Sequence, residues 1–157
     1  MVHASRLKPL SAFKHFKGKV SEKTRSETLE KDGLKVVITL EPFDPKKRKL
    51  TFVEIEGSRY LSKIDDQPYW GTDGALPLEQ GREITVQKNG KTMTVPNEAL
   101  KDLFNPGLYP GNTMVSLNPK DGAIYITSFN SDGAGGYVAG FVFKNGKFNS
   151  RAVFSPF

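Results

Sequence analysis

Apolar side chains recur at every second position in several short stretches of this chain, and tight-turn residues separate those stretches. The clearest case is 34–40, where Leu34, Val36, Ile38 and Leu40 alternate with mostly polar neighbours. Successive side chains of a strand point to opposite faces of a sheet, so this period of two predicts a half-buried β-strand. The chain is therefore expected to fold mainly as antiparallel β-structure.

Hairpins are predicted wherever turn-forming residues lie between two apolar stretches. Asn-Gly pairs occur in two of these turns, and they favour the positive φ angles of a type I′ turn, which matches the twist of paired strands. Another turn is rich in Asn, Pro, Asp and Gly. The expected strand pairs are 84–86 with 93–95, 113–117 with 123–129, and 137–143 with 148–154, and Gly57-Ser58 separates two further expected strands, 50–56 and 59–64. The stretch 137–143 is apolar at nearly every position, which predicts a central strand covered on both faces.

The pattern predicts a mainly β fold, either an antiparallel β-sandwich or a small, partly closed barrel built from hairpins, with one short helix. The helix is expected where Asn97 can act as the N-cap and Leu100, Leu103 and Phe104 have one-face spacing. A barrel would bind a ligand in its mouth, whereas a sandwich would bind one between its end loops.

Positive charge is concentrated at the N-terminus. Residues 1–25 contain seven basic groups and one acidic group, whereas the remainder contains sixteen of each. We therefore predict a basic N-terminal arm over 1–32, poorly ordered or docked through Leu10, Phe13 and Phe16, and an antiparallel β domain over 33–157. A nucleic-acid reader more often carries its excess charge on the folded face, so we expect only weak nucleic-acid contact, through the arm.

Several residue types needed for catalysis are missing or misplaced. The chain has no cysteine, which excludes disulfides, thiolate catalysis and cysteine-ligated metals. Both histidines, His3 and His15, belong to the predicted arm, which argues against a Ser-His-Asp triad and a two-histidine metal site. We therefore predict no catalytic residue, no metal and no cofactor, and a non-enzymatic role is favoured over an enzymatic one.

The sequence is compatible with more than one cellular location. No apolar run is long enough to cross a bilayer, so a soluble protein is expected. No export signal is visible, and the chain fits a cytoplasmic protein as well as an exported one whose signal has been removed.

The most unusual segment is 69–74, which places a Tyr-Trp pair beside a carboxylate inside the long irregular stretch 65–81. Long loops in compact domains are often functional, and aromatic side chains anchor ligands and partners. An alternative is that the rings close one end of the core while Asp73 caps a turn. The predicted ligand- or partner-binding residues are Tyr69, Trp70, Thr72, Asp73 and Asp132.

Asp132 belongs to a second glycine-rich segment, 129–136. Its glycines lead into a predicted strand and not into a helix, which argues against a phosphate-binding loop. Calcium is a weaker alternative, because Asn130, Ser131 and Asp132 offer oxygen atoms without the spacing of an EF-hand. A turn or bulge before the next strand is the simpler interpretation.

These observations favour a non-enzymatic binding or protein-interaction module that uses the 65–81 loop. One alternative is a carboxylate-dependent hydrolase, for which Asp65, Asp66, Asp73 and Asp132 are the candidates. Another is an inhibitor or immunity-type partner protein. The partner is an unknown protein or small ligand, and a homo-oligomer is left open. The basic cluster 45–49 is interpreted as an exposed turn, with nuclear import or a phosphate contact as the alternative.

The loop segments Tyr69-Trp-Gly-Thr-Asp-Gly-Ala-Leu-Pro77, Ser131-Asp-Gly-Ala-Gly-Gly-Tyr137 and Phe143-Lys-Asn-Gly-Lys147 resemble segments of small, uncharacterised bacterial β-rich proteins. The resemblance extends over about the last hundred residues. It implies no established activity and no catalytic residue. Proteins of this size also occur on mobile gene cassettes.

Overall fold

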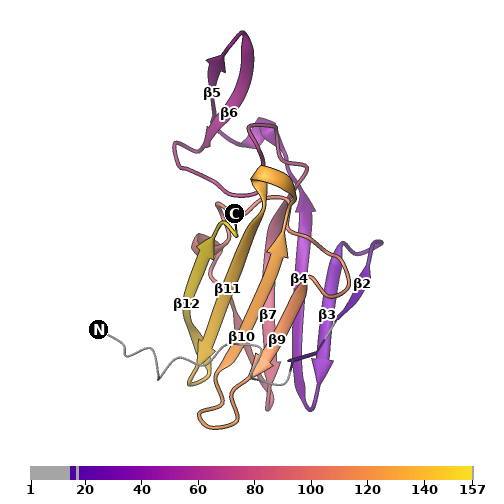
Figure 1. Cartoon of the computed structure of the whole chain (residues 1–157). Coiled ribbons are helices and arrows are strands. Elements are labelled where there is room, and N and C mark those ends of the chain that lie inside the picture. Colours follow the sequence, from indigo (N-terminus) through magenta and orange to yellow (C-terminus); the bar gives the residue numbers. More distant parts are fainter. Residues whose placement is uncertain (1–14, 17, 157) are drawn as a thin grey trace, which may run out of the picture.

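Two antiparallel five-stranded sheets form a β-sandwich, with a separate two-stranded hairpin projecting beyond one end (Figure 1). This computed structural model describes residues 15–16 and 18–156. The mainly β prediction is confirmed. The sandwich alternative holds over the barrel, because the described strands form open sheets and no closed one.

The first sheet has the strand order β1-β9-β10-β11-β12, with every pair antiparallel. The hairpins β9–β10 and β11–β12 confirm two predictions, including one Asn-Gly turn. The strands are β1 (His15–Phe16), β9 (Thr113–Leu117), β10 (Ile124–Asn130), β11 (Tyr137–Lys144) and β12 (Lys147–Phe154).

Strand β11 is central in this sheet, as expected, but it is covered on one face only. Tyr137, Ala139, Phe141 and Phe143 are buried against the second sheet, whereas the residues between them are only half-buried. The prediction that both faces are covered is therefore wrong. The small or β-branched residues between the buried ones form part of the half-exposed outer face.

The second sheet has the order β2-β3-β4-β7-β8, again antiparallel throughout. Strand β4 buries the alternating residues that predicted it, and the β7–β8 hairpin contains the other predicted Asn-Gly turn. The strands are β2 (Lys19–Ser21), β3 (Ser26–Lys31), β4 (Leu34–Pro42), β7 (Glu79–Lys88) and β8 (Lys91–Thr94).

Part of the segment expected to form a basic arm belongs to this sheet. Strands β2 and β3 pair with each other, and β3 pairs with β4 along its whole length. Residues 19–31, which were expected to belong to a separate arm, therefore belong to the sandwich. Residues 1–14, with His3, Leu10 and Phe13, lie outside the described residues.

The inner face of β3 contains an ionisable residue at a core position. Glu27 and Leu29 are both fully buried, as their alternation along the strand requires. Neither carboxylate oxygen of Glu27 makes a hydrogen bond of good geometry. Burial raises the pKa of Glu27, and the nearby Thr113 hydroxyl offsets only part of this effect.

The remaining elements lie mostly in the connections. Strands β5 (Leu50–Ile55) and β6 (Ser58–Ile64) pair with each other and with no other described strand, and they form the projecting hairpin (Figure 1). The described residues also form three short 3-10 turns: η3 (Pro45–Lys47), η4 (Asn97–Ala99) and η5 (Gly133–Gly135). Among the described residues, no helix has the length and hydropathy to span a membrane.

The predicted helix is reduced to the single turn η4. Pro96 and not Asn97 holds the N-cap position, and no side chain caps the turn. Leu100, Leu103 and Phe104 are buried as expected, but they reach the core from the irregular chain that follows η4. The backbone that would continue the helix bonds to another segment: the Asp102 carbonyl accepts from the Trp70 N–H, and the Phe104 N–H donates to the Trp70 carbonyl.

The two ends of the sandwich differ (Figure 1). The hairpin turns of β3–β4, β7–β8, β9–β10 and β11–β12 gather at one end. The long connections and the β5–β6 hairpin lie at the other end. A main core fills the space between the sheets, and a smaller cluster of Phe43, Leu61, Ile64 and Phe104 lies beneath the projecting hairpin.

Candidate binding cleft

The long loops at one end of the sandwich meet at Gly71. The carbonyl oxygen of Gly71 accepts hydrogen bonds from Asn105 Nδ2 at 2.9 Å and from Ser131 Oγ at 2.8 Å. Gly71 has a φ of 111°, and a Cβ at this position would lie 1.9 Å from the carbonyl oxygen of Phe104. Glycine is therefore required both by its backbone angle and by the close approach of another segment.

Asn105 connects three segments of the chain at this junction. Its Oδ1 accepts hydrogen bonds from the backbone N–H groups of Leu78 and Glu79, while its Nδ2 donates to Gly71. Its own backbone N–H donates to the carbonyl of Glu79, and its carbonyl accepts from the N–H of Ser131. These bonds use the donors and acceptors of the side chain and fix the loops 71–79 and 131–135 relative to each other.

The two aromatic residues predicted for the site pack inward. Tyr69 joins the smaller core cluster, edge-on to Phe104, and its hydroxyl donates to the carbonyl of Leu61 at 3.0 Å. Trp70 is half-buried against the main core, with its ring 6.2 Å from that of Tyr137. The backbone of Trp70 bonds to Asp102 and Phe104. Both rings therefore close this end of the core, which is the structural alternative considered for them.

The polar residues of the predicted site lie at the same end. The Thr72 hydroxyl bonds to the Tyr69 hydroxyl and donates to the carbonyl of Ala75, so it stabilises the loop from within. Gly135 packs on the Thr72 backbone, since a Cβ there would lie 2.9 Å from Thr72 Cα. The loops 65–81 and 130–136 therefore touch directly. Asp73 and Asp132 are both exposed.

A surface cleft of about 350 Å³ adjoins this junction. Leu78 and Tyr109 line it while exposing 78% and 69% of their surfaces. Arg25 and Glu79 form an ion pair within the cleft, and Asp132 lies beside them. The lining residues are Arg25, Leu78, Glu79, Asn105, Pro106, Gly107, Tyr109, Ser131 and Asp132.

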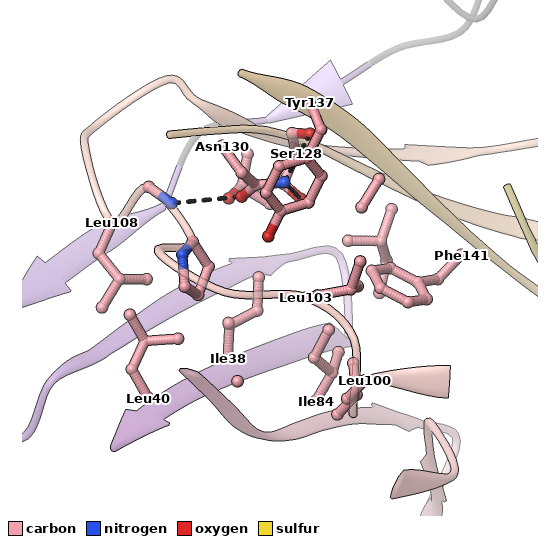
Figure 2. A pocket seen from close by; sticks show the side chains of 16 residues that line it. Ile38, Leu40, Ile84, Leu100, Leu103, Leu108, Ser128, Asn130, Tyr137 and Phe141 are labelled. Carbon is pink, nitrogen blue, oxygen red and sulfur yellow. Dashed lines mark hydrogen bonds between the residues drawn. The ribbon is translucent and has the colours of Figure 1, made fainter. Parts of the chain in front are cut away.

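A second, interior cavity lies between the two sheets behind this cleft (Figure 2). Its volume is about 30 Å³, enough for about one water molecule, and its walls are mainly aliphatic. Figure 2 shows Tyr137, Leu103 and Ile38 around it, with Asn130 at its polar edge accepting a hydrogen bond from the backbone of Gly107. The interior is therefore too closely packed to hold a ligand, as the mouth of a barrel would. The accessible surface for binding lies between the end loops.

Tyr137 connects the interior to the loop junction. Its hydroxyl donates a 3.0 Å hydrogen bond to the carbonyl of Phe104, the same carbonyl that approaches Gly71. Burial raises the pKa of Tyr137 far above its ordinary value, so the hydroxyl keeps its proton and remains a donor.

Replacing Tyr137 with phenylalanine is expected to lower the free energy of unfolding by about 1 kcal/mol, because the Phe104 carbonyl loses its side-chain donor. Urea denaturation of the two proteins would measure the difference. Tyr60→Phe, at an exposed position of β6, provides the comparison. Equal effects of the two substitutions would show that the Phe104 hydrogen bond has no special weight.

Two of the carboxylates considered for hydrolysis have basic partners elsewhere. Asp65 accepts from Arg48 Nε at 2.6 Å and from the Lys49 backbone, and Asp66 pairs with Lys49. These contacts tie the η3 segment to the turn after β6. Within the described part of the chain, no group of three or more metal-ligating side chains comes together.

Sequence reasoning missed most of the residues that line the cleft. Arg25, Leu78, Asn105 and Tyr109 come from separate segments that only the fold brings together. The sequence gives one indication of this region: Asn-Pro-Gly at 105–107 is typical of a sharp change in chain direction. No signal marked Leu78 or Tyr109 as exposed.

No protein-family model, curated protein or solved structure matches this chain in the comparisons. The similarity of the loop segments to small bacterial β-rich proteins therefore stays a prediction.

Proposed function

We propose that this protein is a non-enzymatic binding module that recognises a partner through the end-loop cleft, with the 65–81 loop supplying Leu78 and Glu79. The observation that carries this proposal is the exposure of Leu78 and Tyr109 on the rim of one cleft. Large apolar side chains next to polar groups in a concave surface are the usual anchors of an interface.

The cleft is held in shape before any partner arrives. Asn105 and Gly71 fix its walls through backbone and side-chain hydrogen bonds. A preorganised site loses less conformational entropy on binding than a flexible loop does, so more of the contact energy remains as affinity. The rigid junction therefore supports a binding role for the neighbouring exposed side chains.

The charges favour a particular class of partner. Glu79 is already paired with Arg25, whereas the Asp132 carboxylate is exposed and makes no side-chain cap to the η5 turn. An exposed carboxylate beside two apolar side chains suits a peptide segment with an apolar residue next to Lys or Arg. We propose such a segment of a partner protein as the occupant.

The proposal is tested by panning a phage-displayed library of random linear peptides against the full-length protein. We expect enrichment of peptides with an apolar residue beside a basic one. The double variant Leu78→Ser/Tyr109→Ser should weaken their binding at least tenfold, as measured by fluorescence anisotropy with labelled peptide, since about 1.4 kcal/mol corresponds to a factor of ten.

The matched control is Ile55→Ser/Phe154→Ser, which removes two other exposed apolar side chains from residues that do not line the cleft. This variant should bind the selected peptides like the parent protein. An equal loss of peptide affinity in both double variants would show that the peptides bind through nonspecific apolar contact. Failure to enrich any peptide would count against the binding module itself.

A further inference from the structure

The sequence Lys-Asn-Gly-Lys occurs twice, at 88–91 and at 144–147, and each copy forms the tight turn of a hairpin. The register pairs Lys88 directly with Lys91, and Lys144 directly with Lys147. Like charges at directly opposed positions of a hairpin repel each other and lower its stability. Asp121 offsets part of this repulsion at Lys144, whereas the Lys88–Lys91 pair depends on solvent or an anion.

Both pairs lie at the end of the sandwich where the hairpin turns gather (Figure 1). Strands β8 and β12 contact each other, which brings the two turns close together. The four turns at this end, with the strand residues next to them (30–35, 88–91, 118–122 and 144–147), contain seven lysines and three acidic residues. The neutral total charge of 26–157 thus conceals one basic end of the sandwich.

A groove of about 290 Å³ separates these turns. Lys88 is half-buried, and its Nζ lies 4.0 Å from the position that a Cβ on Gly122 would occupy. Asp121 is the acidic residue among those lining the groove, and its Oδ2 lies 3.4 Å from Lys144 Nζ. Lys88 and Lys91 line the groove without an ion pair to any described residue, and both also line an adjoining hollow of about 430 Å³.

We propose that this groove binds the phosphate backbone of a single nucleic-acid strand, without reading its sequence. Ammonium groups bind phosphate as point charges, and releasing counterions from the strand drives such association. A strand fits a groove that contains half-buried Lys88, whereas a flat bilayer surface would reach only the turn tips. Those tips are Asp-Gly and Asn-Gly turns without apolar side chains that could insert into lipid.

The test uses the full-length protein and a fluorescein-labelled oligothymidine, with binding followed by anisotropy at several salt concentrations. Lys88→Gln/Lys91→Gln/Lys144→Gln/Lys147→Gln should weaken binding at least tenfold. The salt dependence should also become shallower, by about 0.7 in log–log slope for each phosphate that the variant no longer neutralises. The control variant Lys46→Gln/Lys47→Gln/Lys63→Gln/Lys101→Gln removes the same charge from exposed positions outside the groove and should bind within twofold of the parent.

Three outcomes would overturn the proposal: no binding of oligothymidine by the parent protein, equal weakening in both quadruple variants, or binding to phosphatidylserine vesicles without binding to oligothymidine. Absence of oligothymidine binding, or binding to vesicles alone, would exclude a nucleic-acid strand as the occupant of the groove. Equal weakening in both quadruple variants would show that binding depends only on the net charge of the protein. The Leu78→Ser/Tyr109→Ser variant should bind oligothymidine normally, so this result is separable from that for the end-loop cleft.

Discussion

Replacing Gly71 with alanine is expected to lower the free energy of unfolding by about 3 kcal/mol or more. The added Cβ would lie 1.9 Å from the carbonyl oxygen of Phe104, far inside van der Waals contact. The φ of 111° is also a backbone angle that residues with a side chain rarely adopt. Relieving the clash would separate Gly71 from Asn105 and Ser131 and so loosen the wall of the cleft.

Gly33→Ala separates the two contributions to this effect. Gly33 has a φ of 74°, and a Cβ there would meet no atom within 4 Å, so its substitution carries only the cost of the backbone angle. That cost is about 1 kcal/mol. Thermal and urea denaturation of both variants would give the difference. A similar decrease in the free energy of unfolding for Gly71→Ala and Gly33→Ala would contradict the close packing of the 71–74 loop on Phe104.

Replacing Glu27 with glutamine is expected to raise the free energy of unfolding at neutral pH by about 2 kcal/mol. The parent protein buries a carboxyl group without a good hydrogen bond, and burial raises its pKa in the folded state. Above the ordinary pKa of the group, the unfolded chain releases the proton while the folded protein retains it. Rising pH therefore favours the unfolded state until the pH passes the raised pKa of Glu27.

Measuring the free energy of unfolding at several pH values would show whether ionisation of Glu27 destabilises the folded protein. Glu27→Gln should match the parent closely below the ordinary pKa, where the carboxyl group is protonated in both states, and its advantage should grow as the pH rises. Glu30→Gln, at an exposed position of the same strand, should give no such growing difference. A Glu27→Gln advantage that is constant with pH would show that ionisation of Glu27 does not limit stability.

Local chemistry in the sequence was sufficient to predict the hairpins. The turns at 89–90 and 145–146 need positive φ angles, and Asn-Gly supplies them at little steric cost. The alternation in β4 corresponds to its buried face residue by residue. Both signals act over a few positions, so they can be interpreted without knowledge of the rest of the fold.

Strand β3 was not predicted because its inner face hides a polar residue. Only Leu29 is apolar in 26–31, and the other fully buried position is Glu27. A charged residue at a core position removes the period of two on which the prediction depends. The predicted helix failed for a different reason: the apolar spacing at 100–104 was correct, but the backbone of 102–104 bonds to Trp70 and not within a helix.

The candidate site could be located in the sequence only approximately. Tyr69 and Trp70 drew attention because their rings are rare and large, and the same size makes them suitable for closing the core. Leu78 and Tyr109 are ordinary residues in sequence, and their exposure depends on how distant loops meet at Asn105. The gathering of lysines at the hairpin-turn end of the sandwich is likewise not apparent from the net charge of the chain.

The most direct test of the end-loop cleft is an amide NMR titration of the full-length protein with a peptide selected by panning. Chemical-shift changes are expected to cluster at Leu78, Glu79, Asn105, Tyr109 and Asp132, which come from distant positions in the chain and meet only in the cleft. Changes confined to the outer faces of the sheets or to the Lys-Asn-Gly-Lys turns, with these five amides unmoved, would contradict the assignment of the cleft as the binding site.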